Sequence, residues 1–130
     1  MHKVFVYGTL KPGGHYWPAY CEGKVSDAVP ARIRGELYDL HVGYPGLLLG
    51  ADSWVQGYVL TFPREADFLQ LDVLEDYVPG RAEAENEYNR LKVEYFDAAG
   101  APMGEVWAYA MTPKMVRHFK GTLIDGGAWR

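Results

Sequence analysis

Two acids, Asp72 and Glu75, fall on the apolar side of a helix that the sequence predicts over residues 64–76. With about 100° of rotation per residue, they share one arc of that helix with Phe68 and Leu71. A helix that only covers the surface places its acids opposite such an arc. Glu75 also lies near the C-terminal end, where the macrodipole is negative, so burial and the dipole together raise the pKa of its carboxyl. A carboxyl shifted in this direction is suited to carrying protons near neutral pH.

An acid at a helix end has a second interpretation, because it is often solvated or paired with a basic residue. Arg81 and Arg90 are the candidates for such a pair with Glu75. Asp72 is predicted to anchor the strand that carries Arg90. Arg90 itself is expected either to pair with an acid inside the sheet or to bind a ligand carboxylate, and the structural role is favoured.

The segment VFVYGTLKPGG, residues 4–14, offers a different kind of chemistry. An apolar, β-prone run stops at Gly8 and gives way to a second Gly/Pro cluster, with a Thr hydroxyl and backbone N–H groups between them. The segment lacks the spacing and the final Lys-Ser/Thr of a phosphate-binding P-loop. Two interpretations stay open: a plain strand followed by a turn, or a turn whose N–H groups hold an anion.

Other common catalytic patterns are missing from the sequence. His2, His15, His41 and His118 have no metal-ligand spacing, so they are interpreted as surface or core histidines. No G-x-S-x-G nucleophile elbow occurs. Cys21 is the only cysteine, which excludes an internal disulfide, and with no motif around it we expect a buried or inert thiol.

Length and composition indicate a globular protein with one domain over residues 1–130. Its residues are 48% hydrophobic and 23% charged, and the formal net charge is −4. The basic residues are scattered, which argues against a nucleic-acid surface. No apolar run approaches the roughly 20 residues of a membrane span, and the N-terminus does not resemble a signal peptide, so a cytoplasmic location is expected.

The elements that would position these residues are mostly short strands. Strands are predicted over residues 3–7, 31–40, 44–50, 54–62, 88–96 and 104–111, and short helical pieces before Cys21 and over 112–119. Gly57 marks a bulge or a close approach of two backbones, and Trp129 is expected to dock part of the C-terminal tail. The predicted fold class is α+β, a small mixed or antiparallel β-barrel of about six strands with a few flanking helices.

Seven segments, spread over most of the chain, occur in a recognisable order. They are VFVYGTLKPG at the N-terminus, GELYDL (35–40), YPGLLL (44–49), VQGYVL (55–60), LDVLEDY (71–77), YNRLKVEY (88–95) and VWAYAM (106–111). In this order they resemble the gamma-glutamylcyclotransferase-like family, which includes the plant avirulence-induced-gene-like proteins and many small bacterial members. The resemblance implies a small mixed β-barrel with a cavity at one end.

The same resemblance implies which residues form the site. The turn that lines the family's cavity is matched here by Tyr7, Gly8, Thr9 and Leu10. The catalytic glutamate is matched by Glu75, and the tyrosine of the Tyr-x-Arg strand that follows is matched by Tyr88. The family usually has glycine directly after the glutamate. This chain has Asp76 instead, which adds a negative charge beside the acid.

The reaction that the resemblance implies is cleavage of a γ-glutamyl amide by the substrate's own α-amine, which releases 5-oxoproline and an amine. Glu75 would act as base and then as acid, the N–H groups of Gly8, Thr9 and Leu10 would hold negative charge, and Tyr88 would orient the substrate. Because the nucleophile belongs to the substrate, neither a catalytic Ser or Cys nor a cofactor is expected. The expected partner is a small-molecule γ-glutamyl substrate, and the expected assembly is a monomer or homodimer.

Three other functions are compatible with the sequence. The same fold could act on a modified amine or a γ-glutamylamine, with Trp17, Tyr44 and Trp129 as candidates for the outer wall of the cavity. It could also bind a small carboxylate without catalysis, although a binding module has no need of an acid on an apolar face. A scaffold role would predict no well-formed polar cavity.

Overall fold

The computed structural model describes residues 1–130, which form six strands and three α-helices. The strands are β1 His2–Val6, β2 Asp27–Asp39, β3 Pro45–Phe62, β4 Asn89–Phe96, β5 Pro102–Ala110 and β6 Thr122–Leu123. The helices are α1 Trp17–Tyr20, α2 Glu65–Leu74 and α3 Pro113–His118, with short 3-10 helices η1 Glu83–Glu85 and η2 Asp125–Gly127. The predicted α+β class with about six strands is confirmed.

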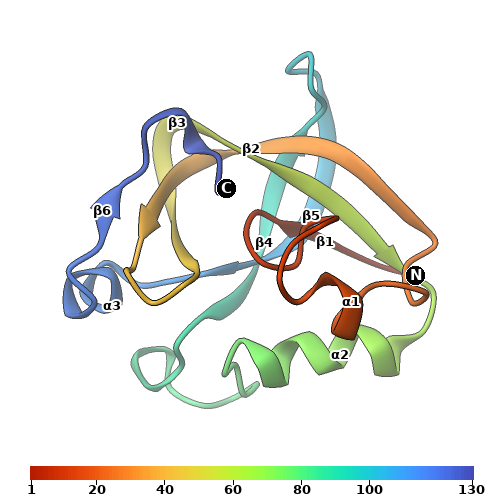
Figure 1. Ribbon diagram of the computed structural model, residues 1–130, viewed down its shortest axis with the longest axis horizontal. Coiled ribbons are helices and arrows are strands. Elements are labelled where there is room, and N and C mark those ends of the chain that lie inside the picture. The colour runs from red at the N-terminus through yellow and green to blue at the C-terminus, as the bar shows by residue number, and fades with distance from the viewer.

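The strands form one sheet that closes into a barrel-like ring. Its order is β3-β1-β5-β4-β2-β6, and an additional pairing of β3 with β2 closes the ring. Only β1 and β5 pair in parallel, and all other neighbours are antiparallel. In Figure 1 the long strands β2 and β3 arch over one side of the molecule, and α2 lies on the opposite side with α1 beside it.

Strand β1 lies at the centre of this arrangement, between β3 and β5. Val4 and Val6 belong to one buried cluster and Phe5 to another, so the strand is buried on both faces, as its apolar run predicts. The chain leaves β1 directly into the Tyr-Gly-Thr-Leu turn. That turn is therefore attached to one of the most deeply buried strands of the protein.

Strand β2 shows the alternation that its sequence predicts. Ile33 and Leu37 are fully buried, whereas Arg34 between them is exposed. The strand begins at Asp27 rather than at the predicted residue 31, because residues 27–30 also pair with β3.

The predicted strands 44–50 and 54–62 are one continuous strand, β3, so the prediction of two strands was wrong. Both halves pair with β2, and the register shifts where Arg34 faces Trp54 and Gly35 faces Leu49. The intervening residues of β3 form an irregularity within the pairing and do not end the strand. The predicted break arose from the polar residues of this irregularity.

Helix α2 covers the cluster of buried residues that contains Val4 and Val6. Phe68, Leu71 and Asp72 are its buried residues, which agrees with the predicted arc. The helix runs from Glu65 to Leu74, slightly shorter than the predicted 64–76. Cys21 lies in the same cluster, and burial raises the pKa of its thiol to about 12, in keeping with the predicted inert thiol.

The C-terminal segment docks against the sheet through β6 and η2. Lys11 Nζ donates to the carbonyl oxygen of Trp129 at 2.6 Å, and the Trp129 side chain is half-buried against the second core cluster. The predicted docking of Trp129 is therefore confirmed. It ties the end of the chain to the loop that follows the Tyr-Gly-Thr-Leu turn.

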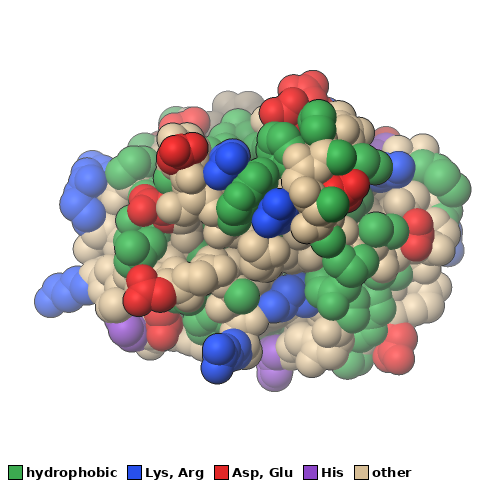
Figure 2. Space-filling model, turned by 90° about the horizontal axis from the view of Figure 1, so that it is seen from above, with side chains coloured by type: hydrophobic (Ala, Val, Ile, Leu, Met, Phe, Trp, Pro, Cys, Tyr) green, Lys and Arg blue, Asp and Glu red, His purple; other side chains and the backbone are tan.

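The surface mixes charges of both signs. Figure 2 shows lysine and arginine side chains separated by acidic and apolar ones on the face that it draws. None of the helices is long and apolar enough to span a membrane.

At Gly57 the backbones of β3 and β1 approach each other closely, which is one of the two alternatives that the sequence leaves open. A Cβ there would lie 2.2 Å from the carbonyl oxygen of Val6 and 2.7 Å from Phe5 Cζ. We expect Gly57→Ala to lower the free energy of unfolding by at least about 2 kcal/mol, because the extra methyl overpacks the β1–β3 contact. Chemical denaturation measures this. The control is Gln56→Ala at the exposed neighbouring position, and equal stability of the two variants would contradict the close approach.

Candidate active site

A cavity of about 260 Å³ opens beside the end of β1. Its lining residues are Phe5, Val6, Tyr7, Gly8, Thr9, Leu10, Tyr16, Tyr44, Pro45, Leu74, Glu75, Glu87, Tyr88 and Tyr109. All six residues that the family resemblance assigns to a site are among them, although they come from three separate parts of the chain. The structure thus brings together the turn after β1, the end of α2 and the residues just before β4.

The turn over residues 7–10 has backbone donors without acceptors. Lys11 N–H donates to the Gly8 carbonyl at 3.1 Å and Tyr16 N–H to the Thr9 carbonyl at 2.9 Å, which fixes the loop. The N–H groups of Gly8, Thr9 and Leu10, in contrast, donate no hydrogen bond within the chain. Three consecutive free donors beside a cavity are well suited to an anion.

Gly8 is required by packing and not by an unusual backbone angle. A Cβ at this position would lie 2.9 Å from two ring carbons of Pro45. Pro45 is itself fixed, because its carbonyl accepts a hydrogen bond of 2.6 Å from the Tyr88 hydroxyl. The turn and the first residue of β3 therefore pack as closely as a glycine allows.

The last turn of α2 ends in two hydrogen bonds that fix the position of Glu75. Asp76 N–H donates to the Val73 carbonyl at 3.3 Å, and Tyr77 N–H donates to the Asp72 carbonyl at 2.9 Å. Together these bonds form a Schellman motif, in which a helix ends at a residue with a left-handed backbone conformation directly after the C-cap. Glu75 is the C-cap residue, the last position before the chain turns away from the helix.

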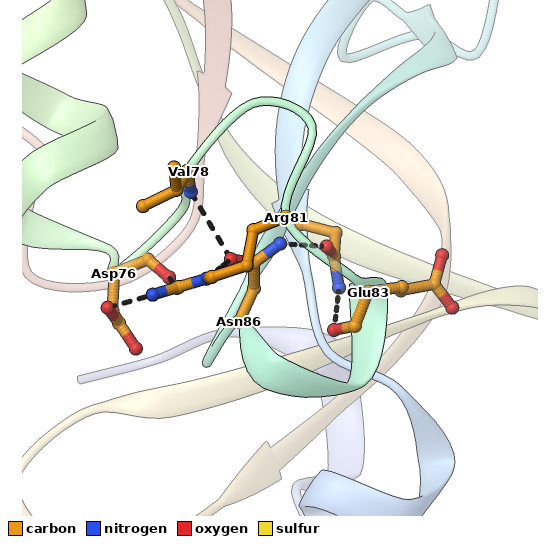
Figure 3. A network of polar contacts seen from close by, with 6 residues as sticks. Asp76, Val78, Arg81, Glu83 and Asn86 are labelled. Atoms are coloured by element: carbon orange, nitrogen blue, oxygen red, sulfur yellow. Dashed lines mark hydrogen bonds and ion pairs between the residues drawn. The ribbon is translucent and has the colours of Figure 1, made fainter.

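Asp76 supplies the left-handed residue, with a φ of +53°. Glycine is favoured in this conformation, which gives a physical reason for the glycine that the resembled family has here. Arg81 Nη2 donates to the Asp76 carbonyl at 2.7 Å and to Asp76 Oδ1 at 3.1 Å. Arg81 Nε donates to Asn86 Oδ1 at 2.6 Å, and Asn86 Nδ2 to Asn89 Oδ1 at 2.8 Å (Figure 3). The network joins the end of α2 to the residue before Glu87.

Asp72 has the structural role that the sequence predicts. Its Oδ1 lies 2.9 Å from Arg90 Nε and accepts a hydrogen bond of 2.6 Å from the Tyr109 hydroxyl. The contact with Arg90 is an ion pair and not a well-aligned hydrogen bond, because Arg90 Nε has no hydrogen-bond partner. The Arg90 guanidinium lies 4.5 Å from the ring centre of Trp107 and 5.1 Å from that of Phe68. Arg90 therefore joins α2 to β4 and β5, and does not line the cavity.

Glu75 has no basic partner. None of the ion pairs of the structure includes it, since Arg81 pairs with Asp76 and Arg90 with Asp72. Burial, and secondly the negative charge of Glu87, raise the pKa of the Glu75 carboxyl from 4.5 to about 8. The predicted direction of the shift and the predicted effect of burial are confirmed, but the like-charged neighbour is Glu87 and not Asp76. A proton carrier for neutral pH has a pKa in this range.

Tyrosines surround the carboxyl of Glu75. The Tyr7 hydroxyl donates to the Tyr109 carbonyl at 2.5 Å, and the Tyr88 hydroxyl donates to the Pro45 carbonyl at 2.6 Å. Burial and, to a lesser degree, the charge of Glu75 raise the pKa of both tyrosines. Since each proton is already donated within the protein, these hydroxyl oxygens can only accept a further hydrogen bond from a ligand.

Sequence reasoning missed Glu87 as a residue of the cavity. The one sequence feature that could have pointed to Glu87 is its position directly before Tyr88. The polar loop around it contains other acids, however, and gives no reason to prefer Glu87 over them. Tyr44, a candidate for the outer wall, does line the cavity, and its hydroxyl donates to Glu87 Oε1. Trp17 and Trp129, the other candidates, pack against the two core clusters and do not line it.

Comparison with known proteins agrees with this arrangement. The sequence profile of the family described as "Gamma-glutamyl cyclotransferase, AIG2-like" matches residues 4–130. A protein of Vibrio cholerae serotype O1, provisionally named as a gamma-glutamylcyclotransferase, is 35% identical over 128 residues, which cover 98% of this chain and 95% of that protein. The chain belongs to the gamma-glutamyl cyclotransferase, AIG2-like family.

Two further relatives extend the comparison. The gamma-L-glutamyl-butirosin B gamma-glutamyl cyclotransferase of Niallia circulans is 31% identical over 113 residues, which cover 84% of this chain and 67% of that protein. The crystal structure of YkqA from Bacillus subtilis superimposes with a TM-score of 0.64 at 22% identity, over 98% of this chain and 39% of YkqA. This likeness shows that the fold is shared.

The left-handed turn that follows Glu75 allows a direct stability test. Asp76→Ala and Asp76→Gly both remove the carboxylate, but only alanine retains the cost of a side chain at positive φ. We expect Asp76→Ala to be less stable than Asp76→Gly by about 1 kcal/mol in chemical denaturation.

The matched control for this pair is the same exchange at Gln70, an exposed position inside α2. There the order should reverse, because glycine in a right-handed helix is less stable than alanine by about 1 kcal/mol. Alanine and glycine of equal stability at position 76 would contradict the left-handed conformation.

Proposed function

We propose that this protein is a cyclotransferase that cleaves a γ-glutamyl amide and releases 5-oxoproline and a free amine. One observation carries the proposal: the unpaired carboxyl of Glu75 shares a cavity with three residues whose backbone N–H groups have no acceptor. This reaction needs two things from a protein: an acid that carries protons, and hydrogen-bond donors that stabilise negative charge. Membership of the family supports the same reaction class.

Glu75 begins the reaction as a base. Its carboxyl is mostly protonated at neutral pH because its pKa is about 8. A substrate that brings its α-ammonium into the cavity supplies the missing positive charge, which favours the ionised form of Glu75. The carboxylate then takes a proton from the ammonium, and the neutral amine becomes a nucleophile.

The N–H groups of Gly8, Thr9 and Leu10 hold negative charge during ring closure. The substrate's α-carboxylate and the oxygen of the γ-carbonyl are both anionic in the transition state, and preorganised backbone donors stabilise such charge. The site must also hold the γ-glutamyl chain folded back on itself, with the amine next to the γ-carbonyl. This orientation contributes much of the rate of ring closure, because the entropy cost of ordering the reacting groups is met when the substrate binds. Tyr88 is proposed to orient the ammonium by accepting a hydrogen bond from it.

Glu75 ends the reaction as an acid. The new bond joins the α-nitrogen to the γ-carbon, and the bond from the γ-carbon to the leaving nitrogen breaks. Over the whole reaction the attacking nitrogen loses two protons and the leaving nitrogen gains two, so the amine departs as an ammonium ion. A carboxyl with a pKa of about 8 both accepts and returns protons readily at neutral pH. The proposed chemistry requires no cofactor.

The proposal is tested by measuring 5-oxoproline release by mass spectrometry from a panel of γ-glutamyl dipeptides, glutathione and γ-glutamylamines. The wild-type protein should release 5-oxoproline from at least one member. Glu75→Gln preserves the shape of the side chain but cannot carry the proton, so its rate should fall by at least about a hundredfold, the usual contribution of an acid–base residue.

The control for this test is Glu85→Gln, which removes an exposed acid in η1 outside the cavity. It should keep the wild-type rate. Full activity of Glu75→Gln would contradict the mechanism, and release from no member of the panel by the wild type would favour a binding module instead.

The raised pKa of Glu75 also predicts a pH dependence of stability. The folded protein holds a proton at Glu75 that the unfolded chain releases above about pH 4.5, so the stability from this group is complete below pH 4.5 and is lost as the pH rises to about 8. Glu75→Gln has no such proton. Its free energy of unfolding should exceed that of the wild type by up to about 5 kcal/mol at pH 8.

Urea denaturation of both proteins at several pH values between about 4 and about 9, with each unfolding free energy extrapolated to water, measures this difference. Groups that do not interact with Glu75 titrate alike in both proteins, so their contributions cancel in the difference. A difference that does not change with pH would contradict the buried, unpaired carboxyl.

A further inference from the structure

The cavity contains two carboxyl groups and no positive charge. Glu75 and Glu87 line it, whereas Lys, Arg and His are absent from its lining residues. Glu87, like Glu75, takes part in none of the ion pairs of the structure. Basic side chains close in sequence to the lining residues have other partners, since Lys11 donates to the Trp129 carbonyl, Arg81 pairs with Asp76 and Arg90 pairs with Asp72. A cationic ligand would supply the positive charge that the lining of this cavity lacks.

Glu87 is held in a fixed position. Its Oε1 accepts a hydrogen bond from the Tyr44 hydroxyl, and Glu87 Oε2 has no partner within the chain. The residues on either side are both buried: Asn86 belongs to the network of Figure 3, and the Tyr88 hydroxyl donates to the Pro45 carbonyl. The rings of Tyr44 and Tyr88 lie 6.4 Å apart. Glu87 thus lines the cavity with one carboxyl oxygen held by Tyr44 and the other without a partner in the chain.

The γ-glutamyl part of the substrate does not account for Glu87. In the proposed reaction its ammonium meets Glu75, and its carboxylate meets the free N–H groups of Gly8, Thr9 and Leu10. Glu87 is half-buried and lines the cavity from the bend that precedes β4, a different segment from the helix end that carries Glu75. It is near enough for its charge to raise the pKa of Glu75. A second positive charge in the ligand would offset the repulsion between these two acids.

We propose that Glu87, positioned by the Tyr44 hydroxyl, binds a positive charge on the amine side of the substrate, so that the preferred substrates are γ-glutamyl amides of diamines or other cationic amines. This assignment rests on the proposed function. It also makes glutathione and γ-glutamyl dipeptides poor substrates, because each carries a carboxylate on its amine side that Glu87 repels.

The test uses three γ-glutamyl amides with amine sides of equal chain length: γ-glutamylputrescine, γ-glutamylbutylamine and γ-glutamyl-γ-aminobutyrate. They end in an ammonium, a methyl group and a carboxylate, respectively. The wild type should turn them over in that order, with kcat/KM for the cationic amide about tenfold above the neutral one, equivalent to about 1.4 kcal/mol. No preference, or a preference for the anionic amide, would overturn the assignment.

The variant that tests Glu87 is Glu87→Gln, and the measured quantity is the ratio of kcat/KM for the cationic amide to that for the neutral amide. This ratio should fall to near one. Tyr44→Phe, which removes the hydroxyl that holds Glu87 but keeps the ring, should lower the ratio partly, and Glu85→Gln should leave it at the wild-type value. A Glu87→Gln protein that is equally impaired with all three amides would overturn the assignment, because Glu87 would then bind the glutamyl part that they share.

Calorimetric binding of the three amides to Glu75→Gln protein separates this assignment from the reaction itself. Tighter binding of γ-glutamylputrescine, lost on adding Glu87→Gln, would support the assignment whether or not the wild type releases 5-oxoproline. The same preference in binding without any turnover by the wild type would contradict the proposed function alone. Absence of binding of all three amides both to this variant and to the wild type would overturn both.

Discussion

Glu75 lies at the end of α2 with its carboxyl in a cavity that contains no basic side chain. An unpaired charge is costly to bury, so the group binds a proton at neutral pH and its pKa rises to about 8. The surrounding structure must hold such a group in place against the gain from moving it into water. The Schellman motif and the contacts of Arg81 with Asp76 do so by fixing the backbone on the C-terminal side of the residue.

Asp72 and Glu75 show how one helix face can carry two acids with different roles. They are three residues apart and face the same side, but Asp72 has an arginine and a tyrosine hydroxyl as partners. Glu75 lies about one turn further on, takes part in none of the ion pairs, and lines the cavity together with several tyrosines and Glu87. The first acid ties α2 to β4 and β5, and the second has no ion-pair partner within the chain.

Much of this arrangement could be predicted from the sequence, because periodicity and turn residues are local properties. The apolar arc of α2, the doubly buried β1 and the close approach at Gly57 all follow from them. The continuity of β3 could not be predicted, since it depends on pairing with β2 across a polar irregularity. Glu87 was missed for a related reason: its place in the cavity depends on a hydrogen bond from Tyr44, which is distant in sequence.

The measurement that tests this account most directly is the pKa of the Glu75 carboxyl in the folded protein. Carbon-13 NMR of the glutamate side-chain carboxyls, recorded as a function of pH, gives it, and the signal missing from Glu75→Gln identifies the residue. The account predicts a midpoint near 8. A midpoint near the ordinary value of 4.5 would mean that the carboxyl is solvated or paired, and that the cavity does not prepare it to carry a proton.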